Sequence, residues 1–369
     1  MRLHNFSAGP AVLPVSVVEE LQANLLEFEG CGLGLMEMSH RGDTFEAIIA
    51  SAFTRVRRVL ALPDDHQVLF LQGGASMQFL MVPQNLLQGG SASYLETGTW
   101  STKAIREARR FGEVRVPFSG KEQGFRSVPQ GYSSSGAASS GAASSGDASK
   151  GEDYLHYTSN NTVVGTQFHE HPTTDGLLVC DMSSDIASRP IDGGAWDLIY
   201  AGAQKNLGPS GVTVVVLSPR AMERAASAGA PTMLDYGVHA RGGSMFNTPN
   251  TLGIYVLERV LAWVEAQGLA AVAATNTRKA DALYDLFDAS DFWRPHAASD
   301  SRSQMNVTWR LADVSLEKPL LSAAESAGFS GIKGHRSVGG LRASIYNACP
   351  EESVLALADF LREFERTHG

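Results

Sequence analysis

The sequence contains little cysteine. Its 369 residues include three cysteines, Cys31, Cys180 and Cys349. Their wide scatter excludes a disulfide framework, and their spacing is not that of metal ligands. We therefore expect a protein from a reducing compartment, without a metal site.

Long apolar runs and an excess of positive charge are also lacking. No run approaches the roughly 20 apolar residues of a membrane span, and the N-terminal segment has no apolar signal core. The net charge is −9, which disfavours nucleic acid as a partner. The chain has 43% hydrophobic and 19% charged residues, as globular proteins do. We expect a cytoplasmic protein with neither membrane nor nucleic acid as a partner.

Short apolar runs alternate with amphipathic stretches along most of the chain. The runs that predict buried strands are Val68–Leu71, Ala92–Leu95, Val114–Val116, Tyr154–Tyr157, Leu177–Cys180, Leu198–Tyr200 and Val212–Leu217. Apolar residues at helical spacing predict helices between several of them. This alternation predicts an α/β fold with a mostly parallel sheet and helices on both of its faces.

Two charged residues follow neighbouring strands of this predicted sheet. Asp181 ends the run Leu177–Cys180, and Lys205 lies in a loop of small residues after Leu198–Tyr200. Ligands of such sheets collect at the carboxyl ends of the strands. Burial among small residues would lower the pKa of a lysine amine. A lysine that can form a Schiff base and a carboxylate that can hold a pyridine nitrogen protonated are what pyridoxal phosphate needs.

Three further features would fit the same cofactor. The turn Gln72–Ser76, between a strand and a helix, would direct backbone N–H groups toward a phosphate. Trp100, in a loop after another strand, could stack on a planar ring or pack in the core. Thr162 could donate a hydrogen bond to a ring hydroxyl or could end a turn.

Basic residues in glycine-flanked loops indicate an anionic substrate. Two His-Arg pairs occur, His40–Arg41 and His335–Arg336, and Arg342 follows the second pair. Arginine binds carboxylate and phosphate through two parallel hydrogen bonds. In an acidic protein, these groups favour a substrate with two anionic ends, although each pair could also be solvated loop charge.

We divide the chain into an N-terminal arm and two domains. Residues 1–16 form an arm associated with the small domain, 17–266 a large cofactor-binding domain, and 267–369 a small C-terminal α/β domain. Residues 132–151 are rich in Ser, Gly and Ala. They cannot bury enough apolar surface to offset their ordering entropy, so we expect a flexible insertion there.

Nine long segments of the sequence stand out as motifs. They are NFSAGPAVLP (5–14), MEMSHRG (36–42), LQGGASMQF (71–79), TGTWS (97–101), YTSNNTVVGTQ (157–167), DMSSDIASRPID (181–192), YAGAQKNLGPSG (200–211), FNTPN (246–250) and GHRSVGGLRASIYNA (334–348). In these segments the chain resembles the class V aminotransferases, and within them the phosphoserine aminotransferase family, over nearly its whole length. Two departures from the family pattern are Ser76, where some relatives carry arginine, and Asn250, where a second proline is more usual.

The resemblance implies a type I pyridoxal phosphate fold and a homodimer with active sites at the subunit interface. By position, Lys205 resembles the Schiff-base lysine, Asp181 the partner of the pyridine nitrogen, Trp100 the stacking residue and Thr162 the ring-oxygen donor. The residues implied as phosphate ligands are Ala75, Ser76 and Gln204, joined by Asn247 and Thr248 from the other subunit. The residues implied as substrate ligands are Arg342 for the α-carboxylate, and His40, Arg41, His335 and Arg336, from both subunits, for the distal phosphate or γ-carboxylate.

The implied reaction is reversible transamination between L-glutamate and 3-phosphohydroxypyruvate, giving 2-oxoglutarate and O-phospho-L-serine in serine biosynthesis. A phosphorylated hydroxythreonine precursor of vitamin B6 is a further expected substrate. A cysteine desulfurase would need a reactive cysteine, and Cys349 has no evident activation. An alanine–glyoxylate type transaminase would not need two His-Arg pairs. A non-catalytic binding protein would be expected to lose Lys205 or Arg342.

Overall fold

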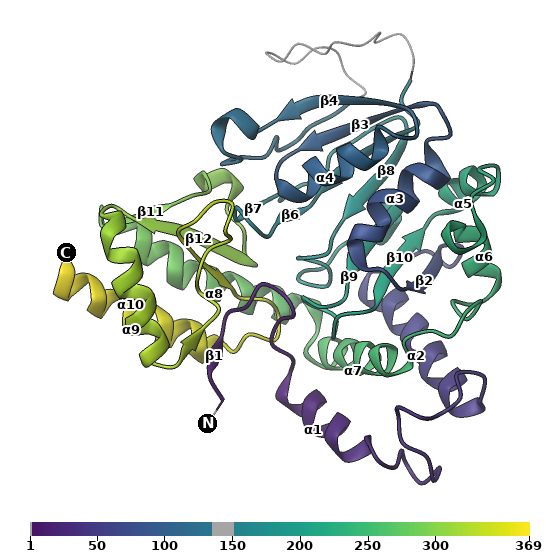
Figure 1. The fold of residues 1–369 in the computed structure, drawn as a ribbon, viewed down its shortest axis with the longest axis horizontal. Helices are drawn as coiled ribbons and strands as arrows, with labels where there is room; N and C mark the ends of the chain where they lie inside the picture. The colour runs from purple at the N-terminus through teal and green to yellow at the C-terminus, as the bar shows by residue number, and fades with distance from the viewer. Residues whose placement is uncertain (1, 135–150) are drawn as a thin grey trace.

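The protein is built around a seven-stranded sheet (Figure 1). A computed structural model describes residues 2–134 and 151–369. Across the sheet, the strands are β2 (Gln67–Leu71), β10 (Thr213–Leu217), β9 (Leu198–Gly202), β8 (Leu177–Asp181), β5 (Tyr154–Thr158), β3 (Ser91–Glu96) and β4 (Glu113–Ser119). From β9 to β4 neighbouring strands are parallel, whereas β10 runs antiparallel to both of its neighbours. The predicted α/β fold with a mostly parallel sheet is confirmed.

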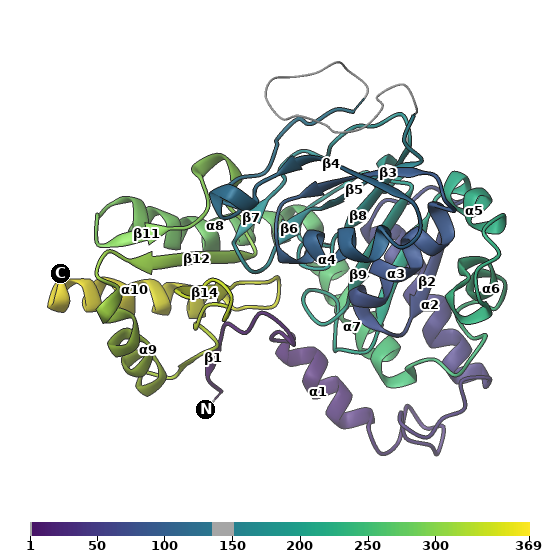
Figure 2. The same cartoon turned by 45° about the horizontal axis from the view of Figure 1, so that its top comes forward.

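Each face of the sheet packs against helices. In β9, Ile199 and Ala201 belong to one apolar cluster, and Leu198 and Tyr200 to another. Because both faces are buried, the strands appear in the sequence as continuous apolar runs. Helices of the first face are α1 (Val15–Asn24), α2 (Asp43–Val59) and α7 (Thr251–Gln267). Those of the second are α3 (Gly74–Leu86), α4 (Thr99–Ala108), α5 (Pro219–Ala226) and α6 (Tyr236–Arg241) (Figure 2).

The C-terminal part of the chain forms a third apolar cluster. Its antiparallel sheet consists of β11 (Trp293–Pro295), β12 (Asn306–Leu311) and β14 (Leu341–Ser344). Its helices are α8 (Leu269–Asp288), α9 (Glu317–Ser326) and α10 (Glu351–His368). The described residues also contain two short strand pairs: β1 (His4–Asn5) with β13 (Phe329–Ser330), and β6 (Asn160–Asn161) with β7 (Thr166–Gln167).

The predicted division into an arm and two domains stays a prediction, and the following contacts agree with it. Phe6 of the N-terminal arm is buried in the C-terminal cluster, and β1 pairs with β13. Gly268, with a φ of +79°, separates α7 from α8. The predicted insertion at 132–151 lies largely outside the described residues, which omit 135–150. In the described ranges, no helix is long and apolar enough to cross a membrane.

A buried carboxylate joins α1, α2 and α7. Glu258 of α7 is 2% exposed and accepts hydrogen bonds from Ser51 Oγ at 2.7 Å, Arg55 Nε at 2.6 Å and Arg259. Arg259 also pairs with Glu20 of α1 at 3.1 Å. Burial alone would raise the pKa of Glu258, but the hydrogen bonds from Arg259, Ser51 and Arg55 outweigh it and lower that pKa.

We expect Glu258→Gln to lower the free energy of unfolding by about 2 kcal/mol at pH 7, because two partly buried guanidinium groups lose their anion. Since the folded-state pKa of Glu258 is lowered, this contribution is present above the ordinary carboxyl pKa. It disappears as pH falls through the folded-state pKa. Urea denaturation of the variant and the unchanged protein, at pH 7 and at a pH below the folded-state pKa of Glu258, measures this loss of stability. Glu363→Gln is the control, because it removes an exposed pair with Arg366 and should change stability little. An equal effect of both variants would contradict the prediction.

Candidate active site

Lys205 lies in the loop that connects β9 to β10. The Ala203 N–H donates to the Val212 carbonyl at 2.9 Å and closes the loop, while the Leu207 N–H donates to the Ala203 carbonyl at 3.0 Å. Inside the loop, Lys205 Nζ donates to Thr162 Oγ1 at 2.7 Å. Two of the predicted site residues, from distant parts of the sequence, are therefore in direct contact.

The environment of Lys205 favours its neutral amine. Burial lowers the pKa of Lys205 to about 8, although the nearby carboxylate of Asp181 partly opposes this shift and the guanidinium of Arg342 adds to it. A lysine with this pKa is neutral in about one molecule in ten at pH 7, far more often than an ordinary lysine, so its nitrogen can act as a nucleophile or a base.

In cofactor-free protein, we expect an amine-selective reagent to modify Lys205 with a midpoint near pH 8. Replacing Asp181 with asparagine should move that midpoint lower, because the carboxylate is an attractive charge that stabilises the ammonium. Mass spectrometry of the Lys205 peptide across a pH series measures both values. A midpoint above pH 10, or a rise in Asp181→Asn, would contradict the prediction.

Asp181 is the last residue of β8 and is 4% exposed. Its Oδ1 accepts a hydrogen bond from the Ser183 N–H at 2.9 Å. Burial raises the pKa of Asp181, while the hydrogen bonds from Ser183 and the charge of Lys205 oppose that rise. A buried carboxylate of this kind is stabilised as an anion by a cationic N–H donor, such as a protonated pyridine nitrogen.

Two buried donors near these residues lack acceptors. Arg342 of β14 is 9% exposed, and its Nη1 donates to the Thr162 carbonyl at 3.3 Å. Within the described residues, neither Arg342 Nε nor Trp100 Nε1 has a hydrogen-bond partner. Trp100 is the second residue of α4, so the predicted loop there is wrong, because the helix begins at Thr99. Buried donors are normally paired, so this arrangement fits a ligand that carries oxygen atoms.

The predicted phosphate turn, Gln72–Ser76, overlaps the start of α3, because the helix begins at Gly74 and not at Met77. Gly73 has a φ of +91°, and an added Cβ there would lie 2.7 Å from Met77 Cβ. Ala75 and Ser76 lie in the first turn of α3, and among described residues no side chain caps this helix. Its first N–H groups can therefore bind an anion. Gln72 Nε2 donates to the Thr248 carbonyl at 2.9 Å, so the loop that contains Asn247 and Thr248 adjoins this turn of the same chain.

The two His-Arg pairs are in different surroundings. Burial lowers the pKa of His335, and the charges of Arg342, Arg336 and Lys103 lower it further. Lys103, whose Nζ lies 4.3 Å from the centre of the Trp100 ring, is a cation of this group that the sequence did not indicate. Arg41 Nε donates to His40 Nε2 at 3.3 Å, and within the described residues no hydrogen bond or ion pair joins these two residues to the other pair.

The N-terminal arm contacts the Lys205 loop, which the sequence also did not indicate. The Ala11 N–H donates to the Gln204 carbonyl at 2.9 Å. A Cβ on Gly9 would lie 3.6 Å from Gln204 Cγ and 3.7 Å from Lys205 Cγ. The arm therefore covers one side of the loop that holds the candidate catalytic lysine.

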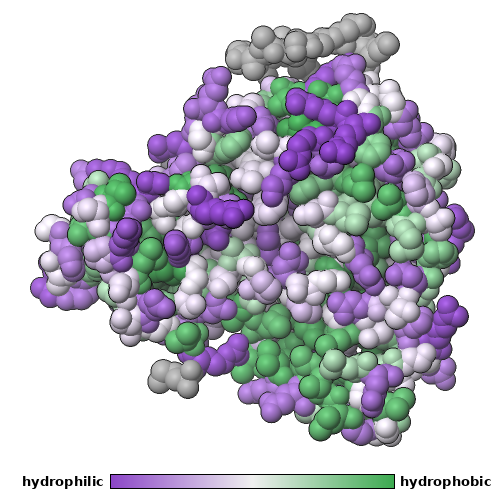
Figure 3. Space-filling model, in the orientation of Figure 1, coloured by the Kyte–Doolittle hydropathy of each residue, from purple (hydrophilic) through white to green (hydrophobic). Residues whose placement is uncertain are grey.

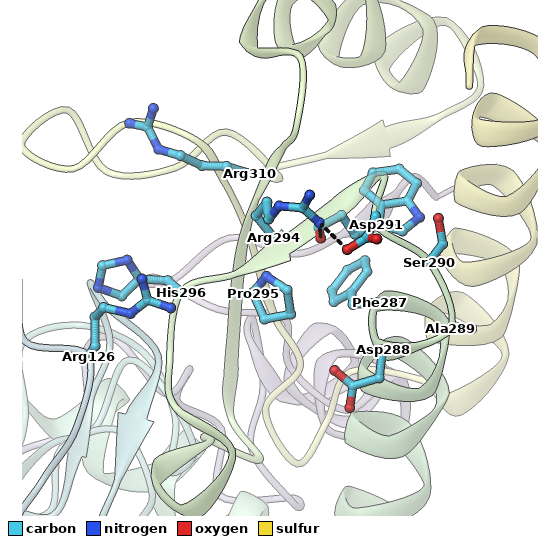
Figure 4. Close-up of a pocket in the computed structure, with 11 residues that line it drawn as sticks. Arg126, Phe287, Asp288, Ala289, Ser290, Asp291, Arg294, Pro295, His296 and Arg310 are labelled. Carbon is cyan, nitrogen blue, oxygen red and sulfur yellow. Dashed lines mark hydrogen bonds and ion pairs between the residues drawn. The ribbon is translucent and has the colours of Figure 1, made fainter.

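Neither a separate basic cavity nor the thiol of Cys349 offers a better candidate for the active site. A cavity of about 560 Å³ contains Arg126, Arg294, His296 and Arg310 (Figure 4), but no predicted site residue lines it. Arg294 already pairs there with Asp291 at 3.2 Å. Cys349 is 2% exposed, and burial raises the pKa of its thiol to about 11, which disfavours the thiolate that a desulfurase needs.

Comparisons with known proteins agree on one group of relatives. The family model described as aminotransferase class-V matches residues 3–357. The phosphoserine aminotransferase of Desulfosudis oleivorans is 50% identical, over 100% of this chain and 99% of its own length. That of Shouchella clausii is 48% identical, over 100% of this chain and 98% of its own length. The structure of phosphoserine aminotransferase from Bacillus circulans matches with a TM-score of 0.92 and 45% identity, over 100% of this chain and 99% of that one.

Proposed function

We propose a function from the premise that this chain belongs to the class V aminotransferase family. It is a phosphoserine aminotransferase, which interconverts L-glutamate and 3-phosphohydroxypyruvate with 2-oxoglutarate and O-phospho-L-serine. The observation that carries the proposal is the part-buried hydrogen bond between Lys205 and Thr162, beside Asp181 and Arg342. The fold is that of the type I pyridoxal phosphate enzymes.

The cofactor is pyridoxal 5′-phosphate, which supplies an electron sink for the carbanion formed at the substrate α-carbon. The unpaired buried donors and the anion-binding turn described above fit a planar, phosphorylated ligand. The residues that would hold the cofactor are Lys205, Asp181, Trp100, Thr162, Ala75, Ser76 and Gln204, with Asn247 and Thr248 contributed by the partner subunit.

Lys205 would move the α-proton of the substrate. Its Nζ is the buried base, with a pKa of about 8, so it can accept a proton near neutral pH and return it. Asp181 would orient the pyridine nitrogen and keep it protonated. Thr162 holds Lys205 Nζ by its hydroxyl and Arg342 by its carbonyl, so one residue sets the distance between the base and the α-carboxylate site.

The substrate would be held at its two anionic ends. Arg342 would bind the α-carboxylate, and His335 and Arg336, with His40 and Arg41, would bind the distal phosphate or γ-carboxylate. One cationic pocket must accept either group in turn. The positive charges of Arg342, Arg336 and Lys103 act on His335 and help to lower its pKa, which supports a cationic pocket there.

The active enzyme would be a cytoplasmic homodimer that shares its active sites. Large apolar side chains are exposed in one chain, including Leu26 at 90%, Met36 at 70% and Phe246 at 47%. Figure 3 shows an apolar area where α1 and the segment after it lie. An apolar patch of this kind is typical of a subunit interface. Pairing would also bring the separate His40–Arg41 pair toward the site of the partner.

The proposal is tested with purified holoenzyme and three amino-donor reactions. We expect turnover of O-phospho-L-serine with 2-oxoglutarate to exceed that of L-alanine with glyoxylate by at least about 100-fold in kcat/KM, because the distal cationic pocket binds nothing on alanine. The phosphorylated hydroxythreonine is the third donor. Equal rates with alanine and phosphoserine would refute the assignment.

A further inference from the structure

A lysine outside the proposed site is completely buried. Lys279 of α8 has an exposed fraction of 0%. Its Nζ donates three hydrogen bonds, to the carbonyls of Ile345 at 2.9 Å, Tyr346 at 2.8 Å and Cys349 at 3.2 Å. Within the part of the chain that the structure describes, no carboxylate forms an ion pair with it. Burying an ammonium costs free energy. If this position served packing alone, an apolar side chain would stabilise the fold more.

The carbonyls that Lys279 binds belong to the segment that leaves β14. This strand ends at Ser344, and α10 begins at Glu351. The Ile345 N–H still donates to the Met305 carbonyl at 2.9 Å, but the rest of the segment up to Cys349 lies outside the strands and helices. A turn closes within the segment, from the Cys349 N–H to the Tyr346 carbonyl at 2.9 Å. Lys279 Nζ binds three carbonyls of this segment at once, and these hydrogen bonds restrain the conformation of the segment.

The same segment contacts the lysine loop. The Asn347 N–H donates to Asn206 Oδ1 at 3.0 Å, and Asn206 follows Lys205 directly in the sequence. Asn206 Nδ2 in turn donates to the Ile186 carbonyl at 3.1 Å. At its other end the segment continues β14, which carries Arg342. The backbone that Lys279 fixes therefore connects the proposed α-carboxylate arginine with the proposed catalytic lysine.

A second polar residue of α8 supports this connection. Asn276 lies one turn before Lys279 and is also buried. Its Nδ2 donates to Asn347 Oδ1 at 2.9 Å and to the Ser188 carbonyl at 3.1 Å. Asn347 Nδ2 donates to the Ala187 carbonyl at 2.8 Å. The polar side chains of α8 thus hold Asn347 against the segment that follows Asp181.

We propose that Lys279 is a positioning residue, which fixes Ile345–Cys349 and thereby sets Arg342 relative to the Lys205–Asn206 loop. This inference rests on the proposed function, because the roles of Arg342 and Lys205 are part of that proposal. A lysine that served packing alone would affect stability without a selective effect on substrate binding or on the mobility of the two site segments.

Lys279→Met keeps the volume and removes the donors. In the holoenzyme, we expect KM for O-phospho-L-serine to rise about tenfold or more, with a smaller change in kcat, because a misplaced carboxylate ligand weakens binding. Leu283→Ala is the matched control. Leu283 lies one turn further along α8, is fully buried in the same apolar cluster and should lower stability without raising KM.

Amide hydrogen exchange of the cofactor-free protein gives a second reading that does not depend on activity. We expect Lys279→Met to speed exchange selectively at 342–349 and 203–208, whereas Leu283→Ala should speed it across the C-terminal cluster. If Lys279→Met does not fold, Asn276→Ala should give the same pattern to a smaller extent. An unchanged KM, or exchange raised evenly, would overturn the proposal. If the unmodified enzyme fails to turn over phosphoserine, the proposed function fails, while the exchange pattern still tests Lys279.

Discussion

Replacing Lys205 with alanine is expected to lower turnover of O-phospho-L-serine by at least about 10³-fold, because the residue that would both hold the cofactor and transfer the α-proton is lost. Thr162 Oγ1 would lose its partner at 2.7 Å, and among the described residues no other lysine forms a hydrogen bond with Thr162. Stopped assays of turnover, together with the visible absorbance of the bound cofactor, measure the effect.

Lys121→Ala is the control for Lys205→Ala. Lys121 is exposed and lies in a short 3₁₀ turn, Lys121–Gln123, after β4. Its loss should leave both absorbance and turnover unchanged. Normal turnover together with the visible absorbance of bound cofactor in Lys205→Ala would show that another group performs the chemistry, and the proposed mechanism would be wrong.

Replacing Arg342 with alanine is expected to raise KM for O-phospho-L-serine and for L-glutamate by about 100-fold or more. Its guanidinium is 9% exposed, and charge-assisted hydrogen bonds to a carboxylate in such surroundings are strong. Arg342→Lys should recover little of the loss, because an ammonium cannot reproduce two parallel hydrogen bonds. Steady-state kinetics with each substrate separates KM from kcat.

Two other arginines sharpen the test of Arg342. Arg336→Ala should raise KM for substrates with a distal anion and leave KM for L-alanine unchanged. Arg342→Ala should instead raise KM for every amino-acid substrate. Arg294→Ala removes the ion pair with Asp291 in the separate cavity of Figure 4 and should change no KM. If Arg342→Ala raised KM only for substrates with a distal anion, Arg342 would bind the distal group and the assignment of Arg342 to the α-carboxylate would be wrong.

Much of the fold follows from local pattern. The apolar runs before Asp181 and Lys205 correspond to β8 (Leu177–Asp181) and β9 (Leu198–Gly202). They were recognisable because strands buried on both faces are continuously apolar and end at polar loops. The proximity of Asp181 and Lys205 then follows, since β8 and β9 are neighbouring parallel strands.

Other features depend on contacts between distant residues. The direction of β10 could not be predicted, because a run such as Val212–Leu217 has the same composition in either direction. Lys279 lies in α8, at an ordinary helical position. Its burial is decided by carbonyls of residues 345–349, which no local spacing indicates. The arm contact at Gln204 is equally non-local.

The position of β2 at the edge of the sheet has a consequence for synthesis on the ribosome. Its neighbour is β10, with Val68 paired to Val216, so β2 emerges long before the strand that completes it. Non-local pairing of this kind is slow and leaves apolar segments exposed meanwhile. Because Leu71 pairs with Thr213, the turn after β2 lies beside the end of the Lys205 loop only once β10 has paired. A stalled nascent chain that ends before Thr213 should be unable to capture the cofactor and should depend on chaperones until β10 is made.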